Sequence, residues 1–93
     1  MSGSPSLTFL MPQAATGNMH FEIHIDTDAG YPSPTSWKSH SVLTGWEYWD
    51  GGSWQPVPQA GVSNTYCGNE ARYNVQSPLA NGTYYRRVRA GVI

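Results

Sequence analysis

An all-β fold, arranged as an antiparallel β-sandwich, is the fold class that the sequence predicts from three observations. Apolar residues recur with a period of two rather than 3.6. Ten glycines and seven prolines are spread along the 93 residues, which suits many turns between short strands. No segment has the periodicity of a helix of useful length. We therefore expect roughly five or six strands in a single domain that spans residues 1–93.

The first two strands are predicted from strict alternation. Residues 7–11 alternate until Pro12, and residues 19–26 form the clearest strand in the chain. The apolar faces are Leu7, Phe9 and Met11 in the first strand and Met19, Phe21, Ile23 and Ile25 in the second, where His20, Glu22, His24 and Asp26 occupy the other face.

Two segments are expected to lack regular structure. Residues 27–41 are predicted to be a long surface loop around Trp37, because Pro32 and Pro34 interrupt any strand or helix interior. Residues 1–5 are expected to be flexible.

A β-hairpin is predicted between residues 46–49 and 54–57. The connecting segment, residues 50–53, reads Asp-Gly-Gly-Ser, and Asp-Gly between apolar runs is a strong hairpin signal because glycine tolerates positive φ. Pro56 and Pro58 should keep the second arm from being a central strand.

Two further strands complete the prediction. Residues 70–76 alternate, with Ala71, Tyr73 and Val75 pointing inward. Residues 83–90 form the last strand after a turn.

The last strand and its preceding turn resemble a known family. Residues 79–90 read Leu-Ala-Asn-Gly-Thr-Tyr-Tyr-Arg-Arg-Val-Arg-Ala, which resembles the E–F corner and F strand of fibronectin type III-like modules. These are Ig-like β-sandwiches that occur in bacterial surface and secreted proteins and in phage virion proteins. The resemblance implies that Tyr84 is a tyrosine-corner residue, whose hydroxyl bonds to upstream backbone, and that Leu79 is the apolar plug beneath it.

The resemblance extends upstream with less specific motifs. Residues 21–28 look like the C strand of such modules, and residues 7–11 then fit the B strand. Residues 46–58 resemble inserts in fibronectin III-like modules of Firmicutes surface proteins and phage virion proteins.

The chain departs from the family pattern at two points. Arg86 stands at an inward position where the bacterial motif usually has Trp, so either it pairs with a carboxylate such as Glu47 or Glu22 or this end of the strand is only partly covered. On this alignment the terminal strands A and G are missing or very short. We favour the explanation that the chain is one piece of a longer protein; the alternative is a shortened sandwich that dimerises by edge pairing or strand exchange.

Composition argues against several function classes. A net charge of −1 is unlike the basic surface that nucleic acids or anionic membranes require, and no apolar run approaches the ~20 residues of a membrane helix. Cys67 is the only cysteine, which excludes an intramolecular disulfide and a zinc–thiolate cluster. Residues 1–5 do not resemble a signal peptide. No catalytic motif is present, so we expect no enzyme activity and no cofactor.

The aromatic hairpin is the strongest candidate for a binding surface. Tyr48, Trp49 and Trp54 are the candidate contact residues, for sugar rings or for another protein, whereas Trp46 is better explained as core. Alternation places Tyr48 with Trp46 on one face of the strand and Trp49 on the other.

Metal binding is a weaker hypothesis. His20 and His24 lie on one strand face with Glu22 and Asp26, but the solvent face of an amphipathic strand explains the pattern better. Residues 26–30 resemble the start of a calcium loop, yet the remaining ligand positions do not match. We expect no bound metal.

Together these observations predict a non-catalytic structural, spacer or adhesion module of a larger bacterial surface protein or phage tail or fibre assembly. Its partners are expected to be other domains or subunits of that assembly, with glycans or a second copy bound through exposed edge strands as further candidates. The expected location is extracellular, at a cell surface or in a virion. The alternative is a carbohydrate-binding module.

Overall fold

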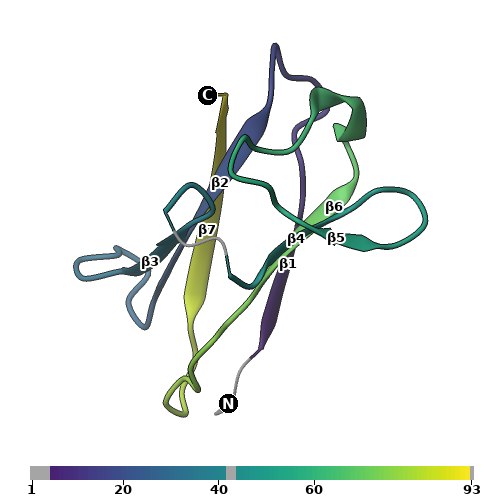
Figure 1. The fold of residues 1–93 in the computed structure, drawn as a ribbon. Helices are drawn as coiled ribbons and strands as arrows, with labels where there is room; N and C mark the ends of the chain where they lie inside the picture. Colours follow the sequence, from purple (N-terminus) through teal and green to yellow (C-terminus); the bar gives the residue numbers. More distant parts are fainter. Residues whose placement is uncertain (1–4, 42–43, 93) are drawn as a thin grey trace.

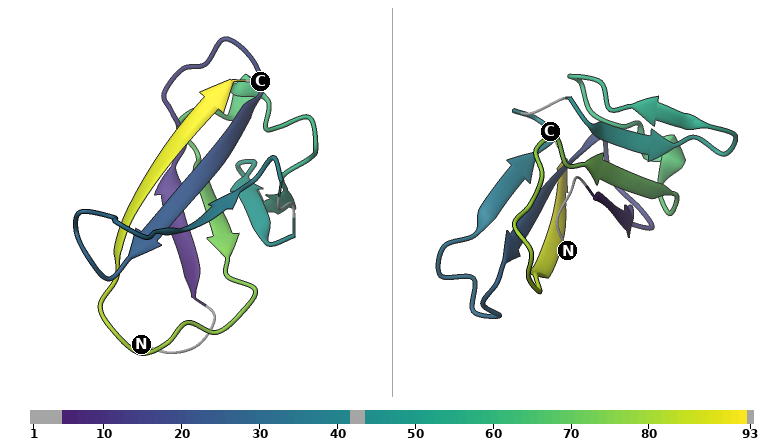
Figure 2. Two further views of the ribbon diagram at one scale, coloured as in Figure 1. Left: turned by 90° about the vertical axis from the view of Figure 1, so that its left-hand side faces the viewer. Right: turned by 90° about the horizontal axis from the view of Figure 1, so that it is seen from below.

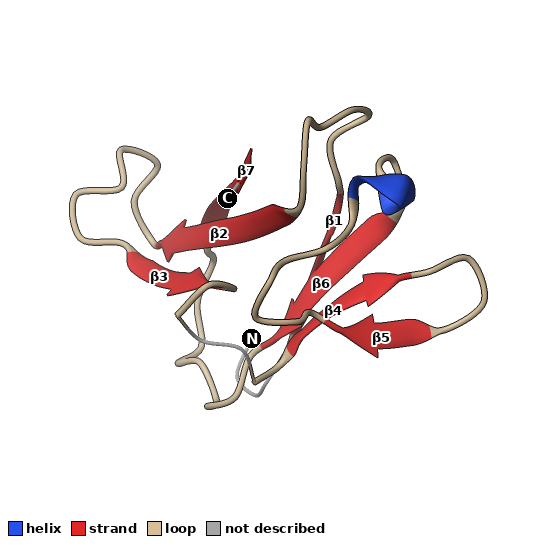
Figure 3. Cartoon of the chain, turned by 45° about the horizontal axis from the view of Figure 1, so that its top comes forward, coloured by secondary structure: helices blue, strands red, loops and turns tan. Residues whose placement is uncertain are grey.

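Two antiparallel β-sheets account for the regular structure of the described residues, 5–41 and 44–92, in the computed structural model (Figure 1). The four-stranded sheet has the order β1-β6-β4-β5, with β1 at Ser6–Leu10, β6 at Glu70–Asn74, β4 at Trp46–Trp49 and β5 at Trp54–Pro56. The three-stranded sheet has the order β3-β2-β7, with β3 at Thr35–Lys38, β2 at Met19–Asp26 and β7 at Tyr85–Val92. A 3₁₀ turn, η1 at Asn64–Tyr66, lies near the start of β6 (Figure 3), and none of the described residues form a helix that could cross a membrane.

The two sheets form separate layers that face one another across a shared core (Figure 2). The ring of Phe9 in β1 lies 5.2 Å from that of Phe21 in β2, so the layers are in direct contact. Trp46 is buried at the centre, with its ring 4.9 Å from that of Tyr73. The predicted all-β architecture of two facing antiparallel sheets is therefore confirmed. The buried apolar core consists of Met11, Met19, Phe21, Ile23, Ile25, Trp46, Val57, Val62, Ala71, Tyr73 and Val75.

The predicted hairpin is present between β4 and β5. The Asp50 carboxylate closes its turn, because Oδ1 accepts hydrogen bonds from the backbone N–H of Gly52 at 2.9 Å and of Ser53 at 2.8 Å. Gly51 has φ 104°, the left-handed conformation that favours glycine. As Pro56 predicted, β5 lies at the edge of its sheet.

One predicted loop is wrong in part. Residues 27–41 contain strand β3, which pairs with β2 and places Trp37 opposite Ile23. Pro34 directly precedes the strand rather than interrupting it, and β3 lies at a sheet edge. The described residues thus form seven strands, more than expected.

The chain start was expected to be flexible. Residues 1–4 lie outside the described residues. Pro5 is half-buried, and its carbonyl accepts a hydrogen bond of 3.0 Å from the backbone N–H of Val75. This contact continues the β1–β6 pairing by one step beyond the strands.

The turn before β7 has the contacts expected of it. The Tyr84 hydroxyl donates a hydrogen bond of 3.0 Å to the carbonyl of Ala80, four residues upstream. Leu79 and Tyr84 are partly buried and pack against the core. The backbone-directed hydrogen bond of Tyr84 is therefore present.

Gly45 is expected to be intolerant of a side chain. It has φ 98°, and a Cβ at this position would lie 2.6 Å from the carbonyl oxygen of Asn74, which is a backbone atom. Gly45→Ala should lower the free energy of unfolding by about 2–4 kcal/mol, measured by urea denaturation. Gly51→Ala is the matched control, since Gly51 has φ 104° and no atom near the added Cβ. Equal losses in the two variants would mean that φ strain alone, without the clash, determines the effect.

Candidate functional site

The three aromatic residues proposed as a contact surface do not share one face of the sheet. Trp49 pairs with Trp54 across the hairpin, and both half-buried indoles lie on the outer face, with ring centroids 5.4 Å apart. Tyr48 lies on the inner face, where its ring packs against the core 5.1 Å from that of Tyr66. Only Trp49 and Trp54 therefore remain together at the surface.

One face of Trp54 is already covered. The Arg72 guanidinium lies 4.0 Å from the centre of the indole, a cation–π arrangement. Arg72 also donates to Glu47 Oε1 at 2.8 Å, as does the Asn74 side chain at 2.8 Å. Sequence reasoning missed this cluster because it depends on the pairing of β4 with both β5 and β6.

His20 is a buried structural residue rather than a free metal ligand. Its Nε2 donates to the carbonyl of Gln59 at 2.9 Å, and its Nδ1 accepts from the Ser39 hydroxyl at 2.7 Å. The Ser39 oxygen in turn accepts the backbone N–H of Phe21 at 2.8 Å, which leaves its own proton for His20. The expectation that His20 lies on a solvent face is wrong, because the segments that contain Ser39 and Gln59 cover this end of β2.

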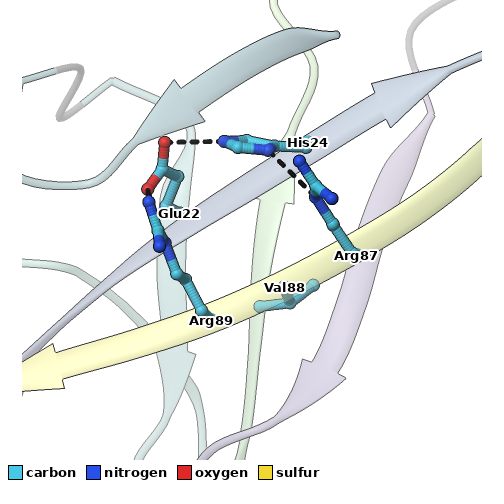
Figure 4. A pocket seen from close by; sticks show the side chains of 5 residues that line it. All are labelled: Glu22, His24, Arg87, Val88 and Arg89. Carbon is cyan, nitrogen blue, oxygen red and sulfur yellow. Dashed lines mark hydrogen bonds and ion pairs between the residues drawn. The ribbon is translucent and has the colours of Figure 1, made fainter. Parts of the chain in front are cut away.

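His24 belongs to a polar network on the outer face of the three-stranded sheet (Figure 4). Arg87 Nε donates to His24 Nδ1 at 3.1 Å, and the Nε2 N–H of His24 donates to Glu22 Oε2 at 2.7 Å. Arg89 donates to the other oxygen of Glu22 at 3.0 Å. Arg87 also stacks on the ring of Tyr31, 4.2 Å from its centre.

This network lines a surface hollow of about 330 Å³. Both nitrogens of His24 are engaged by its neighbours, as are both nitrogens of His20. Within residues 5–41 and 44–92, no group of three or more His, Cys, Asp and Glu side chains could hold a metal ion. The acidic residues of the calcium-like segment instead bind backbone: Asp26 accepts from the N–H of Asp28 and Ser33.

Three carboxyl groups have pKa values below their ordinary range. The hydrogen bond from His24 lowers the pKa of Glu22, with a further contribution from Arg89. The pKa values of Asp26 and Asp50 are lowered chiefly by backbone N–H donors, from Ser33 to Asp26 and from Gly52 and Ser53 to Asp50.

These shifts predict acid sensitivity. A carboxyl whose pKa is lower in the folded state binds protons more weakly there than in the unfolded chain. Its contribution to stability is therefore present above the unfolded pKa of about 4. This contribution is lost as the pH falls through the pKa of the folded state. The urea midpoint should therefore fall steadily below about pH 4.5. In Asp50→Asn the amide oxygen can still accept the two turn hydrogen bonds, so this variant should show a shallower decline. A slope identical to that of the unmodified protein would contradict the assignment.

The inner face of β7 is much less covered than the inner face of the neighbouring strand β2. Arg86, Val88 and Ala90 pair with Ile25, Ile23 and Phe21 of β2 and share their face of the sheet. The three β2 residues are buried, whereas Arg86 and Ala90 are exposed and Val88 is half-buried. The four-stranded sheet therefore covers β2 but does not extend over β7.

The surroundings of Arg86 distinguish the two explanations that the sequence leaves open: pairing with a carboxylate, or a strand end that is only partly covered. Glu47 is bound by Arg72, and Glu22 is bound by His24 and Arg89. Arg86 has no ion pair or hydrogen bond with any described side chain, and it is exposed. The second alternative, a strand whose inner face is only partly covered, is the one that the structure has.

Two hollows lie along this uncovered strip. One, of about 240 Å³, lies between the start of β1 and the start of β7; its lining includes Leu7, Ile25, Leu79, Tyr84 and Arg86. The other, of about 270 Å³, lies toward the far end of β7; its lining includes Pro12, Ala15, Met19, Ala90 and Gly91. The edges of β7 and β1 lie beside each other in the two layers (Figure 2, right). We refer to this strip, from Arg86 to Ala90 with its two hollows, as the open edge.

The comparisons with known proteins do not identify a relative. No family model, no curated protein and no solved structure matches the chain.

Proposed function

We propose that the chain is a non-catalytic structural, spacer or adhesion module of a larger bacterial surface protein or phage tail or fibre assembly. The observation that carries this proposal is the open edge. It combines a strand edge without a neighbour among the described residues, an inner face that is partly uncovered and hollows that meet the core. Such an edge favours contact with another polypeptide.

The proposal includes a fibronectin III-like fold, which several features support. If β1, β2 and β7 correspond to strands B, C and F, then the β2–β7 pairing is the C–F pairing of an Ig-like sandwich, and the order β1-β6-β4 corresponds to the B-E-D order of the Ig constant-type sheet. The hydrogen bond from Tyr84 to Ala80 is the one expected of a tyrosine corner.

Immunogold electron microscopy tests the proposed location and role. Antibodies raised against the purified domain are applied to intact cells and to phage particles from the source that encodes it. Label on the cell surface, or on the tail or fibres of particles, is expected. Label that appears only in sections of the cell interior would contradict the proposal.

Carbohydrate binding is the second candidate, and the paired indoles on the outer face favour it. The half-buried indoles of Trp49 and Trp54 offer aromatic surface on which a sugar ring can stack. Titration with a broad panel of cell-wall and plant glycans should then change the indole fluorescence, and Trp49→Ala should weaken the response. No response from any glycan of the panel would eliminate this candidate.

A further inference from the structure

We propose that the open edge binds an extended segment of a partner protein as an added strand beside β7, and that this segment has apolar residues at alternate positions and a carboxylate opposite Arg86. The inference rests on the proposed function, since it names the partner chemistry of the contact surface described there.

Backbone pairing is the first part of the argument. In the order β3-β2-β7, β7 is bonded to β2 on one side, and no other described strand lies on its other side. β7 has eight residues, Tyr85–Val92, all paired with Met19–Asp26 of β2. A strand of this length, with one edge bonded to β2, offers a row of backbone donors and acceptors to an incoming chain.

The inner face determines which side chains the incoming strand should carry. Side chains at every second position of an added strand would point into the strip that the four-stranded sheet leaves uncovered. Ala90 lines a hollow with Pro12, Ala15 and Met19, and Val88 packs against the apolar core. Apolar side chains are therefore expected opposite these two residues.

The residue of the added strand that lies opposite Arg86 is expected to be acidic rather than apolar. Arg86 lines a hollow together with Leu7 and Leu79, and its guanidinium has no partner among the described residues. An apolar neighbour would remove water from this charge without replacing its hydrogen bonds, which is unfavourable. A glutamate or aspartate opposite Arg86 would supply a charge-assisted hydrogen bond in a partly sheltered site.

Charge also argues against a second copy of this chain as the partner. β7 contains Arg86, Arg87 and Arg89 and no acidic residue. If two β7 strands paired antiparallel about Val88, Arg87 of each copy would face Arg89 of the other. Like charges directly opposite each other destabilise a strand pair. The charge pattern favours an acidic strand of another protein.

A synthetic strand tests the proposal directly. The probe is an end-capped peptide of alternating threonine and valine, with glutamate at the valine position that lies opposite Arg86 when the peptide runs antiparallel to β7. NMR titration of the ¹⁵N-labelled protein should show saturable shifts confined to β7, β1 and the residues of the two hollows, at peptide concentrations up to about 1 mM. No saturable shifts, or shifts located elsewhere, would overturn the proposal.

Charge exchange provides the decisive control. Arg86→Glu should weaken binding of the glutamate peptide by about tenfold or more, and a lysine in place of the peptide glutamate should restore it. Because Arg86 is exposed and unpaired among the described residues, this variant is expected to fold, and Arg86→Gln gives a milder second test. If the charge reversal leaves both affinities unchanged, the carboxylate assignment is wrong.

Alternation provides a second control. A peptide of the same composition in which valine and threonine do not alternate cannot direct all of its valines to the inner face in any register. This peptide should bind at least about tenfold more weakly. Equal binding would show that the inner face does not select the strand.

The other outcomes separate this inference from the proposed function. A concentration-dependent dimer in sedimentation equilibrium, with NMR shifts that map its interface to β7 and no displacement by the peptide, would assign the open edge to a second copy and overturn the acidic partner. Surface label in electron microscopy without peptide binding would contradict only this inference. Peptide binding with label only in the cell interior would contradict only the proposed function.

Discussion

Trp46→Ala should unfold the protein or bring it close to unfolding at 37 °C. Trp46 is 1% exposed and packs against rings from both sheets, with centroids 4.9 Å away for Tyr73 and 6.4 Å for Phe9 and Phe21. Removing a buried Trp side chain typically lowers the free energy of unfolding by about 3–5 kcal/mol. The total free energy of unfolding of a domain of this size is only a little larger than this loss. Near-UV circular dichroism and urea denaturation measure the loss.

Trp49→Ala is the matched control for this prediction. It removes the same side chain from the adjacent part of the strand, but from the outer face, where Trp49 is half-buried against Trp54. Trp49→Ala should lower the free energy of unfolding by an amount on the order of 1 kcal/mol. Similar losses for the two variants would mean that Trp46 is not at the centre of the core.

Ser39→Ala should lower the free energy of unfolding by about 2–4 kcal/mol, a large effect for the removal of one oxygen atom. The Ser39 hydroxyl is fully buried and serves two partners, accepting from Phe21 N–H and donating to His20 Nδ1. Alanine leaves both partners buried without a hydrogen bond. Urea denaturation at pH 7 gives the change in stability.

Ser36→Ala controls for the substitution itself, because Ser36 is exposed in β3, the strand that ends one residue before Ser39. This variant should be within about 0.5 kcal/mol of the unmodified protein. The proposed role of Ser39 would be contradicted if its alanine variant were as stable as that of Ser36.

The strands with strong local signals are those that the sequence predicts well. The bounds of β2 match residues 19–26 because apolar and polar residues alternate through the whole strand. The β4–β5 hairpin is present because its Asp-Gly-Gly-Ser connection favours a tight turn. In both cases the information lies within a few adjacent residues.

The errors arise where a distant segment determines the environment. Alternation assigns His20 to a polar outer face, but the segments with Ser39 and Gln59 fold over it. Alternation also places Arg86 on the inner face correctly, but exposure depends on how far the opposite sheet extends. β3 was missed because Pro34 suggested a loop, whereas a proline is tolerated directly before an edge strand.

The candidate site depended even more on the tertiary structure. The sequence identifies Trp49 and Trp54 as surface candidates, and it raises a partly covered strand as one of two explanations for Arg86. The hollows beside β7 combine residues from β1, β2 and the turn before β7, so no local pattern predicts them. The pairing of Arg72 with Trp54 likewise requires the register of three strands.

Backbone amide hydrogen exchange along β7, followed by NMR with and without the glutamate peptide, tests the central claim most directly. In the free protein, alternate amides of β7 should be protected by β2. The amides between them should exchange rapidly, because no described strand pairs with the second edge of β7. Saturation with the peptide should protect the rapidly exchanging set. Slow exchange of every β7 amide in the free protein, or no added protection at saturation, would contradict an open strand edge that accepts a partner.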